Sequence, residues 1–178
     1  LEERRPGFTE AFEKGREKLD EALAGCDKDD VAGLFWTGMP LASAINIGRD
    51  DVSLIAKLPQ LKAVMKRVVE LDETYYFGGA HLVLGGLYGG VGQMLGGDTK
   101  KAKKHFDRAL ELTKRRFLLV QVMYARTLAV QTQDQKLFRA LLAEVQSAKL
   151  DVLPAQRLAN VAAKRKAVRT LAREAEYF

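Results

Sequence analysis

The sequence predicts an all-α protein, because of its composition, the spacing of its apolar residues and an internal repeat. The chain has 178 residues, enough for one domain with a sizeable core or for a short array of repeats. It contains 25 Leu and 23 Ala but only 3 Ile, 14 Val and 8 Thr. Leu and Ala favour helices, whereas β-branched residues favour strands, so this composition indicates helices. We expect a single helical domain over residues 1–178.

Apolar residues recur at helical spacing along most of the chain. Asp residues that can cap helix N-termini, and Gly or Pro residues between the apolar segments, indicate where the helices begin and end. We expect about eight to nine helices, over residues 8–24, 29–47, 50–56, 59–72, 75–91, 98–113, 116–132, 134–147 and 155–176.

An internal repeat organises these helices. At an offset of 41 residues the sequence matches itself at three positions of an amphipathic segment, which are Arg67 and Arg108, Glu70 and Glu111, and Leu71 and Leu112. Each unit is an apolar helix, a turn and an amphipathic helix. We place the units at roughly 29–72, 75–113 and 116–147, followed by a C-terminal helix over 155–176.

The second unit follows the tetratricopeptide (TPR) pattern most closely. Its matching residues are Leu84-Gly85, Tyr88, Ala102-x3-Phe106-x2-Ala109 and Leu112. The small residues Gly85, Ala102 and Ala109 would let paired helices approach, and Phe106 would fill the space between pairs. The loop 89–97 is about five residues longer than the pattern expects. The sequence therefore predicts a TPR-like helical repeat array, an α-solenoid.

Charge is distributed unevenly along the chain. Residues 1–30 carry 6 basic and 10 acidic groups, residues 31–97 carry 5 of each, and residues 98–178 carry 18 and 8. The basic C-terminal part is either a solvated surface or a surface that meets an acidic partner or the acidic N-terminal segment. We do not expect nucleic-acid binding, because the basic residues lack aromatic platforms and a reading motif.

Two long stretches, 31–48 and 74–97, carry no formal charge. Both are long enough to raise the question of a membrane span. The first contains Pro40 and several polar residues, and the second is rich in glycine, so neither has the dense aliphatic content that drives insertion. We expect both to be helices surrounded by other protein.

Catalytic chemistry has little support in the sequence, and we expect no enzyme, cofactor or metal site. The single cysteine, Cys26, has no neighbouring basic residue that would activate it, which favours an inert helix-end residue. The two histidines are too few for a His-based metal site or triad. The glycine-rich segment 92–99 has Asp98 where a phosphate loop needs Lys. His81 lies among apolar residues, which favours a core or cavity-lining role.

The candidate binding residues are aromatic or polar residues on the first helices of the repeats. In TPR-like arrays these helices line the concave face on which ligands or peptides dock. An uncharged inner face would favour an apolar ligand. The alternative is that these residues only fill the space between packed repeats. We expect a cavity lining formed by Trp36, Tyr75, Tyr76, His81 and Tyr88.

Several motifs resemble the T component of TRAP transporters, the tripartite ATP-independent periplasmic systems. The resemblance covers most of the chain from Phe8 onward. Its residues are Tyr75-Tyr76-x2-Gly79-Ala80-His81-x2-Leu84-Gly85, Gly96-Gly97-Asp98-x2-Lys101-Ala102-x3-Phe106-x2-Ala109-Leu110, Val122-x-Tyr124-Ala125 and Arg157-Leu158-Ala159-Asn160-x2-Ala163-x-Arg165-x-Ala167.

The resemblance implies a periplasmic, lipid-anchored accessory protein with a TPR-like fold. It also implies a homotrimer, a pore or cavity in each protomer, association with a periplasmic solute-binding protein, and relay of a hydrophobic ligand. Asn160 and Arg165 would be polar residues at the pore or at a subunit contact. The family's lipid-bearing cysteine has no counterpart here, since Cys26 is internal, and we expect the export signal and anchor to lie outside residues 1–178. The competing hypothesis is a general TPR-type adaptor that binds a peptide.

Overall fold

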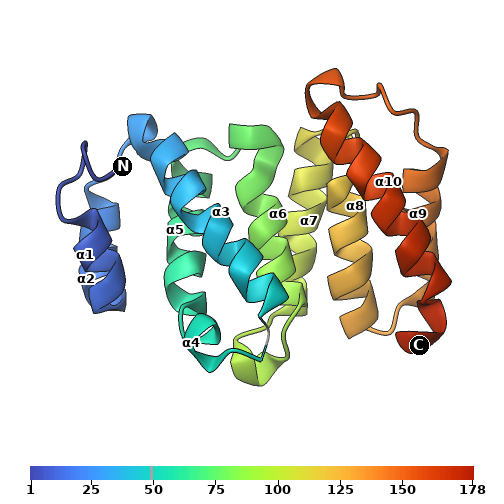
Figure 1. Ribbon diagram of the computed structural model, residues 1–178, viewed down its shortest axis with the longest axis horizontal. Coiled ribbons are helices and arrows are strands. Elements are labelled where there is room, and N and C mark those ends of the chain that lie inside the picture. Colours follow the sequence, from blue (N-terminus) through green and yellow to red (C-terminus); the bar gives the residue numbers. More distant parts are fainter. Residues whose placement is uncertain (49) are drawn as a thin grey trace. The chain divides into compact units, whose positions relative to one another are not determined.

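The computed structural model describes residues 1–48 and 50–178 and confirms the all-α prediction. Every regular element in these two ranges is helical (Figure 1). The chain forms two compact units, Leu1–Tyr76 and Phe77–Phe178. The single domain over 1–178 stays a prediction, and each unit is described by itself.

The first unit contains a short helical hairpin and a longer helix pair. Its elements are α1 (Phe8–Lys14), α2 (Arg16–Ala24), the short 3₁₀ turn η1 (Lys28–Asp30), α3 (Val31–Ile47), α4 (Val52–Ile55) and α5 (Leu58–Asp72). Helices α3 and α5 pack together with close contact at Gly38, which faces Leu61 and Met65 of α5. The α3–α5 pair forms the main core of this unit.

The predicted continuous helix over 8–24 is wrong, because Gly15 divides it into α1 and α2. Gly15 has φ 110° and ψ −174°, a backbone conformation that is almost restricted to glycine. The helical spacing of Phe8, Leu19 and Leu23 is real, since all three side chains are buried. Apolar periodicity therefore located the helices but not the reversal between them.

The second unit takes up most of α6 (Tyr75–Gly89) and the helices that follow. These are η2 (Gln93–Leu95), α7 (Thr99–Leu112), α8 (Leu119–Tyr124), the π-helical turn η3 (Ala125–Ala129), α9 (Gln135–Ser147), η4 (Pro154–Gln156), α10 (Arg157–Ala172) and η5 (Glu174–Glu176). The helix predicted over 116–132 thus begins at Leu119 and changes to π geometry at Ala125.

The predicted Asp caps are confirmed at three helices. The side chains of Asp51, Asp98 and Asp134 accept hydrogen bonds from backbone N–H groups in the first turns of α4, α7 and α9. Each carboxylate satisfies a donor that has no partner within the helix. These caps explain why the N-termini of α4, α7 and α9 lie within two residues of their predicted positions.

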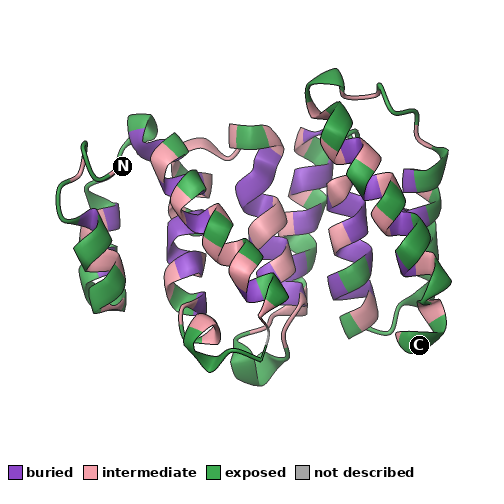
Figure 2. Cartoon of the chain, viewed as in Figure 1, coloured by how far each residue is buried: buried purple, intermediate pink, exposed green. Residues whose placement is uncertain are grey.

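Helices α6 and α7 approach closely at the residues with predicted packing roles. Ala102, Phe106 and Ala109 are completely buried, and Gly85 is buried as well. Figure 2 shows buried segments, in purple, on both α6 and α7. A Cβ atom on Gly85 would lie 2.9 Å from the Phe106 ring, so glycine is what lets this ring fit against α6. Among the described helices, none combines the length and apolar character needed to cross a bilayer.

Candidate functional site

An aromatic cluster joins α3 to the first residues of α6 within the first unit. It consists of Phe35, Trp36, Tyr75 and Tyr76, whose ring centroids lie 5.1 to 5.3 Å apart in the contacting pairs. Most of the pairs are edge-to-face, a favourable arrangement for aromatic rings. Trp36 Nε1 donates a hydrogen bond to the Tyr75 hydroxyl at 3.2 Å. The structure therefore brings three of the predicted ligand residues together, with Phe35 beneath them.

The same cluster is exposed on one side. Phe35 is 1% exposed and anchors the cluster in the core, whereas Trp36 is 50% exposed and Tyr76 38% exposed. Large aromatic side chains that stay partly outside a core are enriched where proteins bind other molecules. Trp36 and Tyr76 therefore provide aromatic area that a ligand or partner could cover.

The backbone turns left-handed at the same place, as it also does at Lys114, Arg115 and Gln133 in the second unit. Tyr76, Phe77 and Gly78 have φ values of 46°, 60° and 68°, three successive residues in the left-handed region. Glycine adopts this region readily, but for an aromatic residue it costs roughly 1 kcal/mol or more. Such strain often marks functional sites. This left-handed backbone sets the direction of the chain at the point where Tyr75 and Tyr76 contact α3.

The other two predicted ligand residues of α6 lie in the second unit, in a histidine cluster. His81 and Tyr88 are buried, and both interact with His105 of α7. The Nδ1 atoms of His81 and His105 are 2.9 Å apart, and the Tyr88 ring stacks on His105 with 5.8 Å between centroids. Lys101 Nζ lies 5.6 Å from the centre of the Tyr88 ring. Sequence reasoning missed His105, although its spacing of four residues from Lys101 places both on one face of α7.

Asn160 and Arg165 have different surroundings on α10. Asn160 is completely buried; its Oδ1 accepts a hydrogen bond from the Leu118 backbone N–H at 2.9 Å, and its Nδ2 donates to the Arg116 carbonyl at 3.0 Å. Arg165 is exposed. In this chain Asn160 holds the start of α8 against α10, and its predicted place at a pore or subunit contact stays a prediction, as does that of Arg165.

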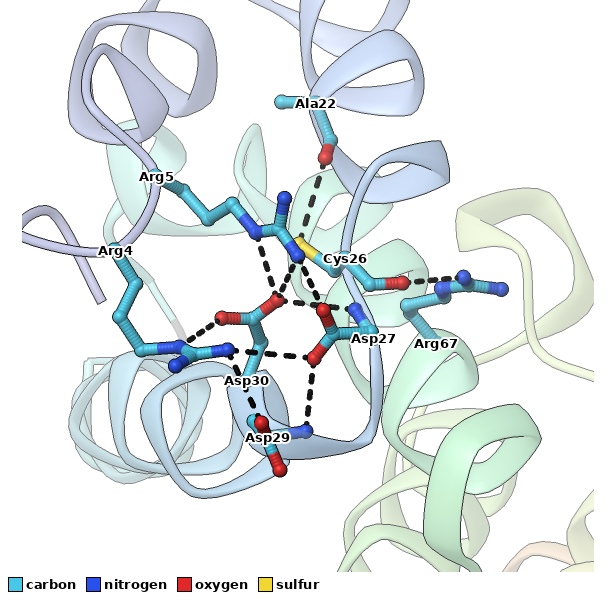
Figure 3. Close-up of polar contacts among 8 residues, drawn as sticks. All are labelled: Arg4, Arg5, Ala22, Cys26, Asp27, Asp29, Asp30 and Arg67. Atoms are coloured by element: carbon cyan, nitrogen blue, oxygen red, sulfur yellow. Dashed lines mark hydrogen bonds and ion pairs between the residues drawn. The ribbon is translucent and has the colours of Figure 1, made fainter.

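A second polar cluster, which sequence reasoning missed, ties the N-terminal residues to the start of α3 (Figure 3). The buried carboxylate of Asp30 accepts from Arg4 Nε at 2.9 Å and from Arg5 Nε at 2.8 Å. Arg5 also reaches Asp27, at 2.8 Å. Burial alone would raise the pKa of Asp30, but the bonds from the two arginines and from the Asp27 backbone outweigh it, and the pKa lies well below its usual value. We call these residues the N-terminal clasp.

Cys26 lies beside the clasp and is buried. Its Sγ donates to the Ala22 carbonyl at 3.4 Å, and its own carbonyl accepts from Arg67 at 2.6 Å (Figure 3). Burial raises the pKa of this thiol, with the nearby Asp30 carboxylate adding to the effect. The thiolate is therefore disfavoured, which fits the expectation of an inert residue.

Neither of the two hollows found in the separate units contains a predicted ligand residue. In the second unit an open hollow of about 420 Å³ is lined by Asp107, Leu110, Glu111, Lys114 and Arg115. In the first unit a hollow of about 270 Å³ lies between α2 and α5. Within the described ranges, no group of three or more His, Cys, Asp or Glu residues could hold a metal ion. The exposed aromatic cluster is therefore the candidate functional site.

The part of the chain that the structure describes is thus all-helical, with aromatic side chains partly exposed at one place in the first unit. A family model described as TRAP transporter T-component matches residues 1–178. The chain belongs to this family, as the sequence motifs predicted. The family is an accessory component of TRAP transport and not a class of enzymes.

A curated relative was also found in the spirochaete Treponema pallidum (strain Nichols). It is described as an uncharacterized protein and is 28% identical over 108 residues. The match covers 60% of this chain and 33% of the relative, so the chain spans about a third of the length of that protein. This similarity assigns no activity or partner.

Proposed function

We propose that this chain handles a hydrophobic ligand for a TRAP-type uptake system and binds the solute-binding protein of that system. The observation that supports this most is the aromatic cluster, in which Trp36 and Tyr76 are exposed on sequence segments that carry no formal charge. An apolar guest or a partner surface would cover these rings and gain their burial energy, roughly 25 cal/mol per Å² of apolar area. Tyr75 would orient Trp36 through their hydrogen bond.

A TPR-like arrangement of the repeats is part of this proposal. Arg67 pairs with Glu70 at 3.1 Å, and their repeat equivalents, Arg108 and Glu111, pair at 2.6 Å. The equivalent positions 65 and 106 are both completely buried, and each side chain packs against a glycine of the preceding apolar helix. Matching positions thus have matching environments in α5 and α7, as repeats of one structural unit require.

The proposal includes the location and assembly implied by the family. We place the protein in the periplasm, held at a membrane by a lipid anchor outside residues 1–178 and assembled as a homotrimer. Within the second unit, we propose His81, Tyr88, Asn160 and Arg165 as further residues for ligand handling.

Ligand handling can be tested through the intrinsic fluorescence of Trp36, the single tryptophan of the chain. Laurate, a fatty-acid anion with a long apolar chain, serves as the probe ligand. We expect saturable quenching or a shift of Trp36 emission, and at least about tenfold weaker laurate binding by a Tyr76→Ala variant, measured by the same signal. Leu158→Ala is the control, because Leu158 is 84% exposed on α10 in the other unit. Laurate binding that Tyr76→Ala leaves unchanged would assign Tyr76 to packing alone.

The alternative of a general peptide-binding adaptor gives a different result in the same experiment. An adaptor would ignore laurate and respond to peptides, with an affinity that depends on peptide sequence. Saturable peptide binding that differs between unrelated peptide sequences, without laurate binding, would favour this alternative.

A further inference from the structure

The connection between α6 and α7 exposes two large apolar side chains at its tip. Within the segment 90–97, which carries no charge, the 3₁₀ turn η2 exposes Met94 completely and Leu95 to 58%. Exposed apolar side chains are ordinary when single, but two adjacent ones at the tip of an uncharged loop form a small patch. We call residues 93–97 the apolar tip.

The apolar tip has a defined backbone. Gly96 has φ 77° and donates its N–H to the Gln93 carbonyl at 2.9 Å. The Gly97 N–H donates to the Gly92 carbonyl at 3.1 Å, and a Cβ atom on Gly97 would lie 1.9 Å from the Val91 carbonyl oxygen. The turn is therefore closed by hydrogen bonds and requires glycine at this position. Its geometry holds Met94 and Leu95 outward.

Lysines follow directly after the tip, at the start of α7. Lys101 pairs with Asp98 and Lys103 with Asp107. Lys100 and Lys104 are exposed and form no ion pair with the residues that the structure describes. They are four residues apart, so they lie on one face of α7, about 6 Å apart along its axis. Lys100 follows the apolar tip by three residues, and Lys104 lies one helical turn further along α7.

We propose that the apolar tip inserts into the headgroup region of an anionic lipid bilayer, with Lys100 and Lys104 binding the lipid phosphates. Apolar side chains next to cationic ones are the combination that a membrane interface with negative headgroups selects. Lipid phosphates would neutralise the two lysine charges while the acyl-chain boundary covers Met94 and Leu95. This contact would be peripheral, and it does not depend on ligand handling by the aromatic cluster.

Sedimentation with lipid vesicles tests this directly. The protein is mixed with vesicles of phosphatidylcholine alone or with a third of phosphatidylglycerol, and the bound fraction is measured. We expect binding to the anionic vesicles only. The double variant Met94→Ser/Leu95→Ser should lower the partition coefficient at least about tenfold, and Lys100→Glu/Lys104→Glu by a similar factor.

Matched controls separate this contact from general effects of polarity and charge. Leu158→Ser/Val168→Ser changes two other exposed apolar residues, and Lys136→Glu/Lys149→Glu makes the same change in net charge elsewhere in the second unit. Both controls should bind like the wild type. If the tip variants bind like their controls, or if the wild type does not bind anionic vesicles, the proposal is wrong. A change in oligomeric state by the tip variants, without a change in vesicle binding, would assign the tip to a contact between copies.

Discussion

The buried carboxylate of Asp30 depends on two arginines that precede it by more than twenty residues. Arg4 and Arg5 are partly exposed, but their bonds end on an oxygen pair that is closed off from water. A buried charge that loses its partners is strongly destabilising, typically by about 3 to 5 kcal/mol. The clasp therefore ties residues 1–5 to the start of α3 through electrostatics.

We expect Asp30→Asn to lower the free energy of unfolding by about 2 kcal/mol at neutral pH, as measured by urea denaturation, because Arg4 and Arg5 lose charge-assisted hydrogen bonds to the carboxylate. The folded-state pKa of Asp30 is lowered, so its stabilisation is present above the unfolded pKa of about 4 and is lost as the pH falls toward the folded value. The wild type should thus lose stability below about pH 4, and the variant should lack this part of the loss. Asp29→Asn is the control, because the Asp29 side chain is 80% exposed. Equal effects of the two substitutions would contradict a special role for Asp30.

Individual site residues were only partly accessible from the sequence. Trp36, Tyr75 and Tyr76 could be found because they are aromatic residues on uncharged, repeated helices, and they do lie together. The contact between His81 and His105 could not be found from the sequence. It joins residues 24 positions apart on two helices, and the sequence does not give how each helix is rotated about its axis. The left-handed backbone at Tyr76 was also hidden, since tertiary contacts override local preference there.

Helix positions were predictable where a cap and an apolar stripe agree. Asp98 and Asp134 mark the starts of α7 and α9, and the apolar residues of both helices repeat at helical spacing. The prediction was wrong where a helix is interrupted without a change in its apolar pattern, as at Gly15. The segment before Leu119 is a related case, because Asn160 of another helix binds its backbone and replaces the helical hydrogen bonds.

The junction between α1 and α2 allows a direct test at this scale. We expect Gly15→Ala to destabilise the first unit by roughly 1 to 3 kcal/mol, because alanine is strained at φ 110°. No atom lies within 4 Å of the added Cβ, so the cost would be conformational alone. Gly25→Ala is the matched control, since Gly25 has φ −78° and its Cβ would make only an ordinary contact. Thermal unfolding followed by circular dichroism measures both, and an unchanged Gly15→Ala variant would contradict the assigned junction.

Over the whole molecule the charge changes from an acidic N-terminal segment to a basic C-terminal part. Residues 1–30 have a net charge of −4 and residues 98–178 a net charge of +10. Part of the acidic charge is used within the first unit by the N-terminal clasp. Ion pairs within the helices use further charges of both segments, such as Lys14 with Glu10 and Lys103 with Asp107. The net charge that is left connects this gradient to the proposed homotrimer.

We expect multi-angle light scattering to give the mass of a trimer at about 0.15 M salt and a smaller species at about 1 M, where the Debye length falls to about 3 Å. A variant with Arg165→Glu and Arg169→Glu on α10 tests the basic surface, and Lys136→Glu/Lys149→Glu is its charge-matched control. A monomer at all concentrations would contradict the assembly. A trimer insensitive to salt would show that the charge gradient is only solvated surface.

The central claim is that a TRAP partner binds at the aromatic cluster. The decisive measurement is isothermal titration of this protein with a TRAP solute-binding protein from the same organism, using wild type and the double variant Trp36→Ala/Tyr76→Ala. We predict saturable binding by the wild type and at least about a hundredfold loss for the variant, because exposed Trp and Tyr anchors dominate such interfaces. Leu158→Ala/Val168→Ala should bind like the wild type. Undiminished affinity of the aromatic variant, with its helicity intact, would contradict the central claim.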